Sequence, residues 1–316
     1  MRLYLFDDLM NQRSNVVKRF WQFMLFMILL IISDRVVGLV LLNGEEKYFG
    51  LSEPAQILLV GYSHLELGVD KLLLERELKK PVAKYTMAGS TLRDRKLMVE
   101  HYLNRNPESV KLVIFDVDSH LFNTGGLSSN SYKLFYPFMD DPAVAGFVKG
   151  QASSLSEYGL RTLLHTTRYN DATLGLAIRG HLHNWQNYKH GQVNIDLLKL
   201  QIMEGKHPTI DLNQEQMDIF QSTIEILRAR GIKVLLFYVP TLDIYNEVEP
   251  QKHEQATAVF ESMAANDSGV YFLDYNPYFS NNHDIFRDPV HVNAEGQKLV
   301  SDRLVQDIRS EIFNNE

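Results

Sequence analysis

Three side chains of the sequence have the types and the spacing of a serine-dependent catalytic triad. Ser63 directly follows a short apolar segment, residues 56–62, while Asp288 and His291 lie close together near the C-terminus. A serine hydroxyl becomes a nucleophile when an imidazole accepts its proton and a carboxylate orients that imidazole. If the three side chains meet in space, they predict acyl transfer with Ser63 as nucleophile, His291 as base and Asp288 as the orienting acid.

The local sequence around each of these residues indicates a fixed backbone position, but it also permits a purely structural role. Ser63 is expected at the start of a helix, where free backbone N–H groups can stabilise an oxyanion. Serine is also a common helix cap, so capping is the favoured explanation for Ser63 taken alone. Pro289 favours an extended Asp288, and Asn293 is expected to cap the last helix. The alternative for this segment is a surface turn that merely begins a helix.

Hydrophobic patterning predicts a doubly wound, mainly parallel α/β sheet of the flavodoxin-like kind that positions these residues. Short strands rich in β-branched and aromatic residues are expected at Ile57–Gly61, Val82–Thr86, Lys111–Val117, Lys233–Val239 and Val270–Asp274. Helices are expected at Leu65–Leu78, Leu92–Asn104, Gln214–Arg230, Lys252–Ala265 and Asn293–Ile312. Such sheets bind ligands at the carboxyl ends of their strands, where Ser63 and Asp118 would both lie.

A long segment, residues 122–212, interrupts this alternation within the domain expected over 50–316. It is long for a single connection, so we interpret it as a helical cap or lid. Short helices are expected within it at Ala143–Lys149, Ser156–His165 and Ile195–Met203. Its aromatic cluster indicates packing inside the lid, although aromatics over a serine site also suit a carbohydrate or lipid acceptor. The cluster consists of Tyr132, Phe135, Tyr136 and Phe138.

Composition excludes several classes of protein. The 316 residues are 45% hydrophobic and 22% charged, which is ordinary for a globular chain. The net charge of −7 argues against a nucleic-acid-binding surface. There is no cysteine, so disulfides, thiolate catalysis and zinc–thiolate sites are excluded. We expect neither a metal nor a cofactor.

An apolar segment near the N-terminus predicts a membrane anchor. Residues 20–42 are almost continuously apolar, and about 20 such residues span a bilayer. Basic residues precede the segment, which predicts that residues 1–19 are cytoplasmic and that the domain is extracytoplasmic. Trp21 and Tyr48 are expected at the two interfaces. The adjacent Asp34 and Arg35 would be costly in lipid and are expected near an interface or against a partner helix.

The order of these motifs resembles the SGNH/GDSL hydrolase superfamily. In that superfamily a serine follows the first strand, glycine and asparagine blocks supply oxyanion donors, and Asp-x-x-His precedes the last helix. Tyr62 stands where an Asp is usual, and Gly89 matches the glycine block. The resemblance implies that the N–H groups of Ser63 and Gly89 bind the oxyanion.

One block departs from this resemblance. The asparagine block is replaced by residues 116–120, Asp-Val-Asp-Ser-His. Ser119 or His120 is therefore expected to supply the missing donor, and an ionised Asp118 would hinder the oxyanion. His64, Asp118 and His120 are expected to line the site.

The anchor combined with this resemblance is similar to bacterial proteins that O-acylate cell-surface polymers. It implies an acyltransferase or its accessory that takes an acyl donor, modifies a glycan hydroxyl and works beside a multi-pass membrane O-acyltransferase. An exported esterase with the same triad is an alternative. A non-catalytic partner in a membrane complex is another, favoured by the absent asparagine block and the Asp34-Arg35 pair.

Two further motifs indicate competing chemistry. Asp116 and Asp118 also resemble the Asp-x-Asp of haloacid-dehalogenase-type phosphatases, with Asp116 as nucleophile and Mg²⁺ as partner. That motif normally follows the first strand of its domain, whereas this one follows the third, so we interpret it as coincidental. His181, His183 and His190 could bind a metal, but no nearby carboxylate completes a set, and a solvated loop is favoured.

Overall fold

Five parallel strands form the central sheet of the chain, for which a computed structural model describes residues 2–124 and 130–313. The strands are β1 (Ile57–Gly61), β2 (Val82–Thr86), β3 (Leu112–Asp116), β4 (Lys233–Tyr238) and β5 (Val270–Asp274). Their order is β2-β1-β3-β4-β5, and every neighbouring pair is parallel. The chain leaves β1 toward β2 and returns to β3 on the other side, so the topological switch point lies between β1 and β3.

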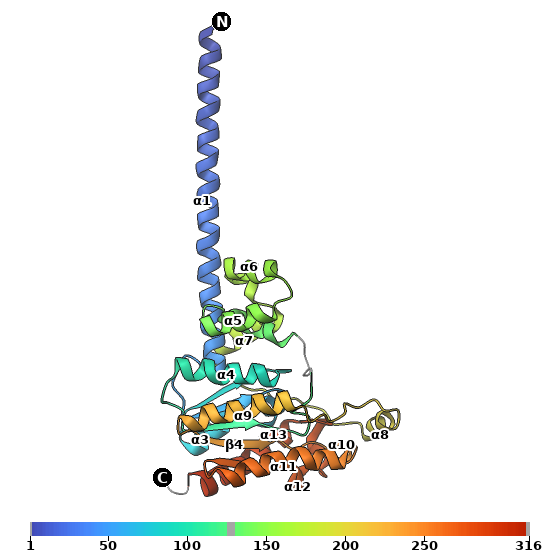
Figure 1. Cartoon of the computed structure of the whole chain (residues 1–316). Helices are drawn as coiled ribbons and strands as arrows, with labels where there is room; N and C mark the ends of the chain where they lie inside the picture. Colours follow the sequence, from blue (N-terminus) through green and yellow to red (C-terminus); the bar gives the residue numbers. More distant parts are fainter. Residues whose placement is uncertain (1, 125–129, 314–316) are drawn as a thin grey trace.

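Helices cover both faces of this sheet, which confirms the predicted fold class (Figure 1). One face packs against α4 (Leu92–Arg105), α9 (Gln214–Ala229) and α11 (Pro250–Asn266). The other packs against α3 (Lys71–Leu78) and α13 (Ala294–Asp307). Shorter elements complete this part of the chain: α10 (Asp243–Asn246), α12 (Asn276–Phe279), the 3-10 helix η3 (His283–Ile285) and the π-helical turn η4 (Ile308–Ile312). Every residue of β1, β2 and β3 is buried, as strands covered on both faces must be.

The structure corrects one predicted helix near the site. The segment Leu65–Leu78 is two helices, α2 (Ser63–Gly68) and α3, and not one. Val69 is extended between them, and the Asp70 carboxylate caps α3 by accepting from the backbone N–H groups of Leu72 and Leu73. An aspartate at such a position competes with the helix and starts a new one. Ser63 is therefore the first residue of a very short helix.

The segment 122–212 is helical but does not form one group, and residues 125–129 lie outside its described part. Its elements are the 3-10 helices η1 (Ser131–Phe138) and η2 (His165–Arg168) with α5 (Pro142–Gln151), α6 (Leu155–Leu163), α7 (Asp171–His181) and α8 (Ile195–Met203). The sequence did not predict α7. The four aromatic residues of η1 are all buried: Tyr132, Phe135, Tyr136 and Phe138.

The first helix, α1 (Arg2–Phe49), is continuous and does not end at residue 42 as expected for a simple anchor. Among the described residues it alone is long and apolar enough to cross a membrane, over Val17–Phe49, which fits a single-pass anchor or a signal sequence. Figure 1 shows it projecting from the sheet, with α5, α6 and α7 beside its lower part. Tyr48 is no interface marker, because it is buried and its hydroxyl donates to Asn187 Oδ1 at 2.9 Å.

Two glycines let α1 and α7 pack in close backbone contact. A Cβ on Gly180 would collide with the carbonyl oxygen of Gly44, and one on Gly44 would collide with that of Ala177. Beside this crossing, a hydrogen bond of 2.8 Å joins His181 Nε2 to the carbonyl oxygen of Val40. The lower part of α1 is therefore a structural element of the domain and not a loose tether.

We expect Gly180→Ala to lower the free energy of unfolding by about 1–3 kcal/mol, because the added methyl group forces the two helices apart. Gly175→Ala is the matched control on the same helix, since nothing lies within 4 Å of its Cβ position. That control should be neutral or stabilising by about 0.5–1 kcal/mol, because alanine favours the helix. Denaturant unfolding of both variants in detergent measures the difference, and equal values would contradict the close crossing.

Candidate active site

Ser63 is positioned by a buried carboxyl group from the neighbouring strand. Asp116, at the end of β3, accepts hydrogen bonds at Oδ2 from the backbone N–H groups of Tyr62 and Leu65, both at 3.2 Å. Gly61 makes this approach possible, because a Cβ there would lie 2.5 Å from the Asp116 Cβ. The turn that carries Ser63 is thus held on both of its sides by one carboxyl group at the switch point of the sheet.

Asp288 and His291 lie on a small antiparallel pair, β6 (Phe286–Asp288) and β7 (His291–Val292), that the sequence did not predict. Asp288 Oδ1 accepts from the backbone N–H groups of Val290 and His291, at 3.1 and 3.0 Å, which fixes the turn between the strands. Asn293 then caps α13, accepting at Oδ1 from the N–H groups of Glu295 and Gly296. Both ends of the short segment carrying His291 are therefore fixed.

The three predicted side chains meet in one continuous chain of contacts. His291 Nε2 lies 2.8 Å from Ser63 Oγ, inside the 4 Å expected for such a pair. His291 Nδ1 lies 2.9 and 3.0 Å from the two carboxylate oxygens of Asp288. Burial would raise the pKa of Asp288, but the hydrogen bonds from His291 and from backbone N–H groups lower it. Asp288 is therefore ionised at neutral pH and can hold a proton on Nδ1, which leaves Nε2 free to accept one from Ser63.

A cavity of about 590 Å³ opens over Ser63 and His291. The core supplies most of its wall, and the segment 122–212 closes one side with Tyr132 of η1 and with Phe147 and Gln151 of α5. The cavity is also lined by His64, Asp118 and His120, which the sequence predicts there, and by Ser119. A volume of this size lies within the usual range for a small-molecule ligand site.

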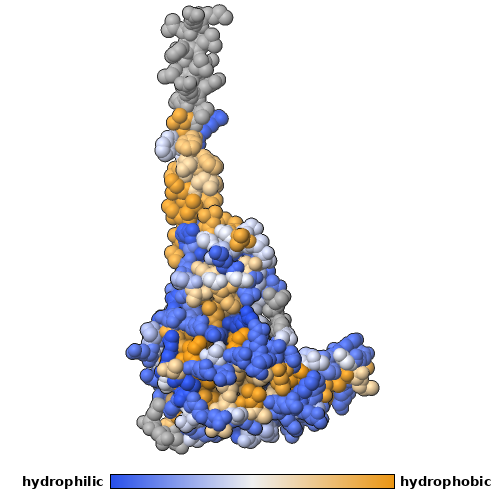
Figure 2. Space-filling model, viewed as in Figure 1, coloured by the Kyte–Doolittle hydropathy of each residue, from blue (hydrophilic) through white to orange (hydrophobic). Residues whose placement is uncertain are grey.

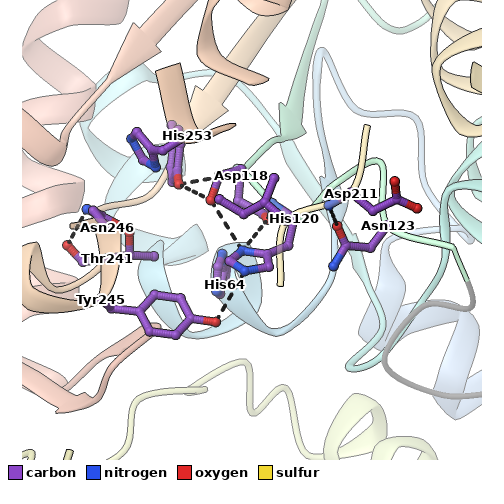
Figure 3. A network of polar contacts seen from close by, with 12 residues as sticks. His64, Asp118, His120, Asn123, Asp211, Thr241, Tyr245, Asn246 and His253 are labelled. Atoms are coloured by element: carbon purple, nitrogen blue, oxygen red, sulfur yellow. Dashed lines mark hydrogen bonds and ion pairs between the residues drawn. The ribbon is translucent and has the colours of Figure 1, made fainter. Parts of the chain in front are cut away.

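A second polar network surrounds Asp118 and His120 (Figure 3). Asp118 accepts from the Tyr62 hydroxyl at Oδ2, at 2.6 Å, and from the backbone N–H of His120 at Oδ1, also at 2.6 Å. The His120 ring stacks on Tyr245. Burial opposes the charge of Asp118, but the neighbouring imidazoles and the hydrogen bond from Tyr62 lower its pKa. Its charge is therefore stabilised inside this network and is not an unpaired charge facing Ser63.

His64 brings a second imidazole close to His291, with the two ring centroids 5.4 Å apart. Burial lowers the pKa of His64 to about 3, although the charge of Asp118 opposes the shift. At neutral pH His64 is thus uncharged. A neutral ring at this distance does not repel the positive charge that His291 acquires when it accepts a proton from Ser63.

The three expected oxyanion donors are placed differently. Among the described residues, the backbone N–H groups of Ser63 and Gly89 have no acceptor, so both are available. Gly89 does not line the cavity, whereas the adjacent Ser90 and Thr91 do. Ser119 lines the cavity, but its N–H donates to the Tyr238 hydroxyl at 3.1 Å and its Oγ accepts from that hydroxyl at 3.2 Å. An oxyanion role for Ser119 would require breaking these bonds and stays a prediction.

The geometry does not favour the phosphatase alternative. Asp116 is fully buried, does not line the cavity and is bonded to the serine turn. Within residues 2–124 and 130–313, no group of three or more His, Asp or Glu side chains is arranged to hold a metal ion. The insertion histidines also have other contacts, since His183 packs on Trp185 and His190 on Tyr188.

Arg95, which was not predicted from the sequence, contacts both Tyr62 of the Asp118 network and Asp116 beneath the serine turn. Its guanidinium lies 4.4 Å from the centre of the Tyr62 ring and donates to the carbonyl oxygen of Asp116 at 3.0 Å. Arg95 belongs to α4 and is buried with Leu92 and Val99, on the apolar side of that helix. A charged residue at the helical spacing of an apolar stripe is the signal that could have revealed it, because buried charges need partners.

No protein-family model matches the chain, and no curated protein matches it. Among solved structures, it is similar to a proposed acylhydrolase from Bacteroides fragilis NCTC 9343, at 14% identity and a TM-score of 0.39, over 80% of this chain and 86% of that one. It is also similar to a GDSL-like lipase from Bacteroides thetaiotaomicron VPI-5482, at 13% identity and a TM-score of 0.41, over 85% of this chain and 98% of that one. Both are distant likenesses, and neither identifies the reaction of this chain.

The buried Asp116 predicts an unusual dependence of stability on pH. Burial raises its pKa from 3.8 to about 8, against the opposing charge of Arg95. Between these two values the folded state binds a proton that the unfolded state has lost, so stability falls as the pH rises. Asp116→Asn keeps an oxygen acceptor for the serine turn and cannot ionise. We expect the unfolding free energy of the variant, relative to wild type, to rise by a few kcal/mol between about pH 5 and pH 8.

Asp118→Asn is the matched control for this measurement. The pKa of Asp118 is lowered below 3.8, so its contribution to stability is complete above that value and is lost only as the pH falls below it. Its difference from wild type should therefore change less between about pH 5 and pH 8 than that of Asp116→Asn, because Asp118 acts in this range only by raising the pKa of Asp116. Denaturant unfolding across this range tests both variants. A constant difference for Asp116→Asn would show that Asp116 is not protonated beneath the serine turn.

Proposed function

We propose that this chain is a membrane-anchored, serine-dependent acyltransferase, or its accessory, that acts in the O-acylation of an extracytoplasmic glycan. The observation that carries the proposal is the unbroken line of contacts from Ser63 Oγ through the His291 ring to the Asp288 carboxylate. The lid over the cavity supports the proposed glycan substrate, and the apolar first helix supports the proposed location at the membrane.

The geometry supports a two-step reaction through an acyl-enzyme. His291 Nε2 accepts the hydroxyl proton as Ser63 Oγ bonds to the carbonyl carbon of the acyl donor. The same proton then passes from His291 to the leaving group, and Ser63 is left acylated. In the second step an acceptor hydroxyl gives its proton to His291 and its oxygen attacks the acyl carbon. The bond from that carbon to Ser63 Oγ then breaks, and Oγ takes the proton from His291. Asp288 stabilises the imidazolium in each step.

The charge on the carbonyl oxygen requires donors at the same edge of the sheet. The backbone N–H of Ser63 is available there, and the N–H of Gly89 follows the carboxyl end of the adjacent strand β2. The side-chain donor of the resembled superfamily is replaced by Asp118, which is already bonded to Tyr62. Loss of one oxyanion donor costs about 10²–10³ in rate. We therefore expect a slow enzyme, which suits a protein that works beside a membrane O-acyltransferase.

The location follows from α1 in this proposal. The basic residues before the apolar segment support an N-terminus in the cytoplasm and a cavity outside it. The acceptor in this proposal is then a glycan hydroxyl of the cell envelope. An exported esterase is the second candidate, because the same triad hydrolyses an acyl-serine whenever water replaces the acceptor.

A Ser63→Ala variant tests the nucleophile. Full-length protein in detergent should release p-nitrophenol from p-nitrophenyl acetate, and Ser63→Ala should reduce kcat by at least about 10³. Ser222→Ala on α9, which does not line the cavity, is the control. An activity that survives in Ser63→Ala would reject the triad. Adding a glycan acceptor separates the two candidates, since a transferase forms an acylated glycan and an esterase forms only the free acid.

The two aspartate–histidine pairs of the cavity predict contrasting variants. Asp288→Asn should reduce kcat by about 10⁴, because an amide facing Nδ1 favours the wrong imidazole tautomer. Asp118→Asn should cost at most about tenfold, since Asp118 bonds to Tyr62 and His120 and does not contact His291. Steady-state kinetics on the same ester measure both. An equal loss in Asp118→Asn would instead assign the base to His120.

A further inference from the structure

Helix α6 is amphipathic, but its apolar side is exposed and its charged side faces the protein. Its two charged residues face the protein: Glu157 accepts from the Tyr136 hydroxyl at 2.7 Å, and the Arg161 guanidinium lies 4.3 Å from the centre of the Tyr136 ring. Its leucines point outward, with Leu155 78% exposed and Leu163 66% exposed. A soluble surface helix has the opposite arrangement, with its apolar side buried.

The C-terminal end of α6 is fastened to α1 at the charged pair of that helix. Arg35 donates to the carbonyl oxygen of Leu163 at 2.9 Å and contacts the His165 ring. The Asp34 carboxylate accepts from the backbone N–H groups of His165 and Thr166, at 2.8 and 2.9 Å, and from the Thr166 hydroxyl at 2.5 Å. The start of η2 and the end of α6 therefore have a fixed height along α1, at residues 34 and 35.

The length of the apolar segment sets the depth of this junction in a membrane. From Phe20 to Ser33, α1 rises only about 20 Å at 1.5 Å per residue. A bilayer has a hydrocarbon core of about 30 Å, which needs about 20 residues and reaches from Phe20 to near Val40. Val36, Val37, Leu39 and Val40 indeed remain exposed on α1. Asp34, Arg35 and the attached end of α6 then lie at the depth of the outer leaflet.

We propose that α6 lies in the outer leaflet, with its leucines in contact with lipid, and that it forms a second membrane contact beside α1. The inference rests on the proposed membrane anchor. It explains the charged pair, because the peptide groups of η2 and α6 bond Asp34 and Arg35 at a depth where water is scarce. It also explains the inverted helix, because the exposed residues of α6 include three leucines and no charged residue. They are Leu155, Ser156, Gly159, Leu160, Thr162 and Leu163.

Lipid fits this surface better than a soluble partner does. Figure 2 shows the exposed apolar side chains of α1 above the domain, and the end of α6 is bonded to that helix through Arg35. A helix that lies along a membrane interface buries its apolar side in the boundary between head groups and acyl chains. Any occupant of this surface must also lie beside the membrane-spanning helix, and in a bilayer that neighbour is lipid.

Single-cysteine labelling can test this depth, because the chain has no native cysteine. Leu155→Cys and Leu163→Cys report on α6, Leu29→Cys reports on the apolar part of α1, and Glu254→Cys on the exposed surface of α11 is the aqueous control. Each full-length variant is labelled with an environment-sensitive fluorophore and reconstituted into phosphatidylcholine vesicles that contain nitroxide-labelled lipid. Unchanged ester hydrolysis shows that each variant is folded.

We expect the labels at positions 155 and 163 to shift to the blue and to be quenched by nitroxide lipid, as at position 29, while the label at 254 is not. Solvent-like emission at 155 and 163 with quenching at 29 would overturn the proposal and leave the anchor intact. Blue-shifted emission without lipid quenching would overturn it in favour of a protein partner or a second copy. Absence of quenching at 29 would reject the anchor itself, independently of the triad.

Discussion

The buried carboxyl group of Asp116 ties the serine turn to the neighbouring strand, and the position of Ser63 depends on that tie. β1 and β3 are adjacent only because the chain reverses its direction of winding between them. Their carboxyl ends therefore open into a crevice, and Asp116 closes its base by bonding the N–H groups of Tyr62 and Leu65. Gly61 is required at the same point, since any side chain there would displace the carboxyl group. The nucleophile is placed by the sheet and not by its own two-turn helix.

The electrostatics of the crevice follow from how each charge is paired. Burial drives the pKa of Asp116 up, whereas hydrogen bonds and nearby imidazoles drive that of Asp118 down. Two carboxyl groups two residues apart thus differ in charge, with one neutral beneath the serine and the other ionised beside Tyr62. His64 stays neutral by burial. The charge in direct contact with the ring of His291, the catalytic base, is therefore the Asp288 carboxylate.

Much of this arrangement could be predicted from the sequence, and the failures have physical causes. Strands buried on both faces are visible as apolar runs, and their order places Ser63 and Asp118 at one edge. The break at Val69 was missed because an aspartate capping a new helix depends on local competition that an apolar pattern does not show. The β6–β7 pair was missed because His291–Val292 is too short to have a period. Arg95 and the Tyr62–Asp118 bond depend on tertiary contacts between distant elements, which single-sequence periodicity does not contain.

The sequence predicts a simple anchor where the structure has a helix that is packed into the domain. Hydropathy identifies an apolar segment but not the residues that cover it. The sequence therefore shows Asp34 and Arg35 only as charges that are unfavourable in lipid. In the structure their partners come from α6 and η2, more than a hundred residues away in sequence. Helix α5 supplies Phe147 and Gln151 to the wall of the cavity and leads directly into α6. The lid over Ser63 is therefore connected through two short helices to the charged pair on α1, so any displacement of α1 relative to the domain must be transmitted to the cavity wall or absorbed between them.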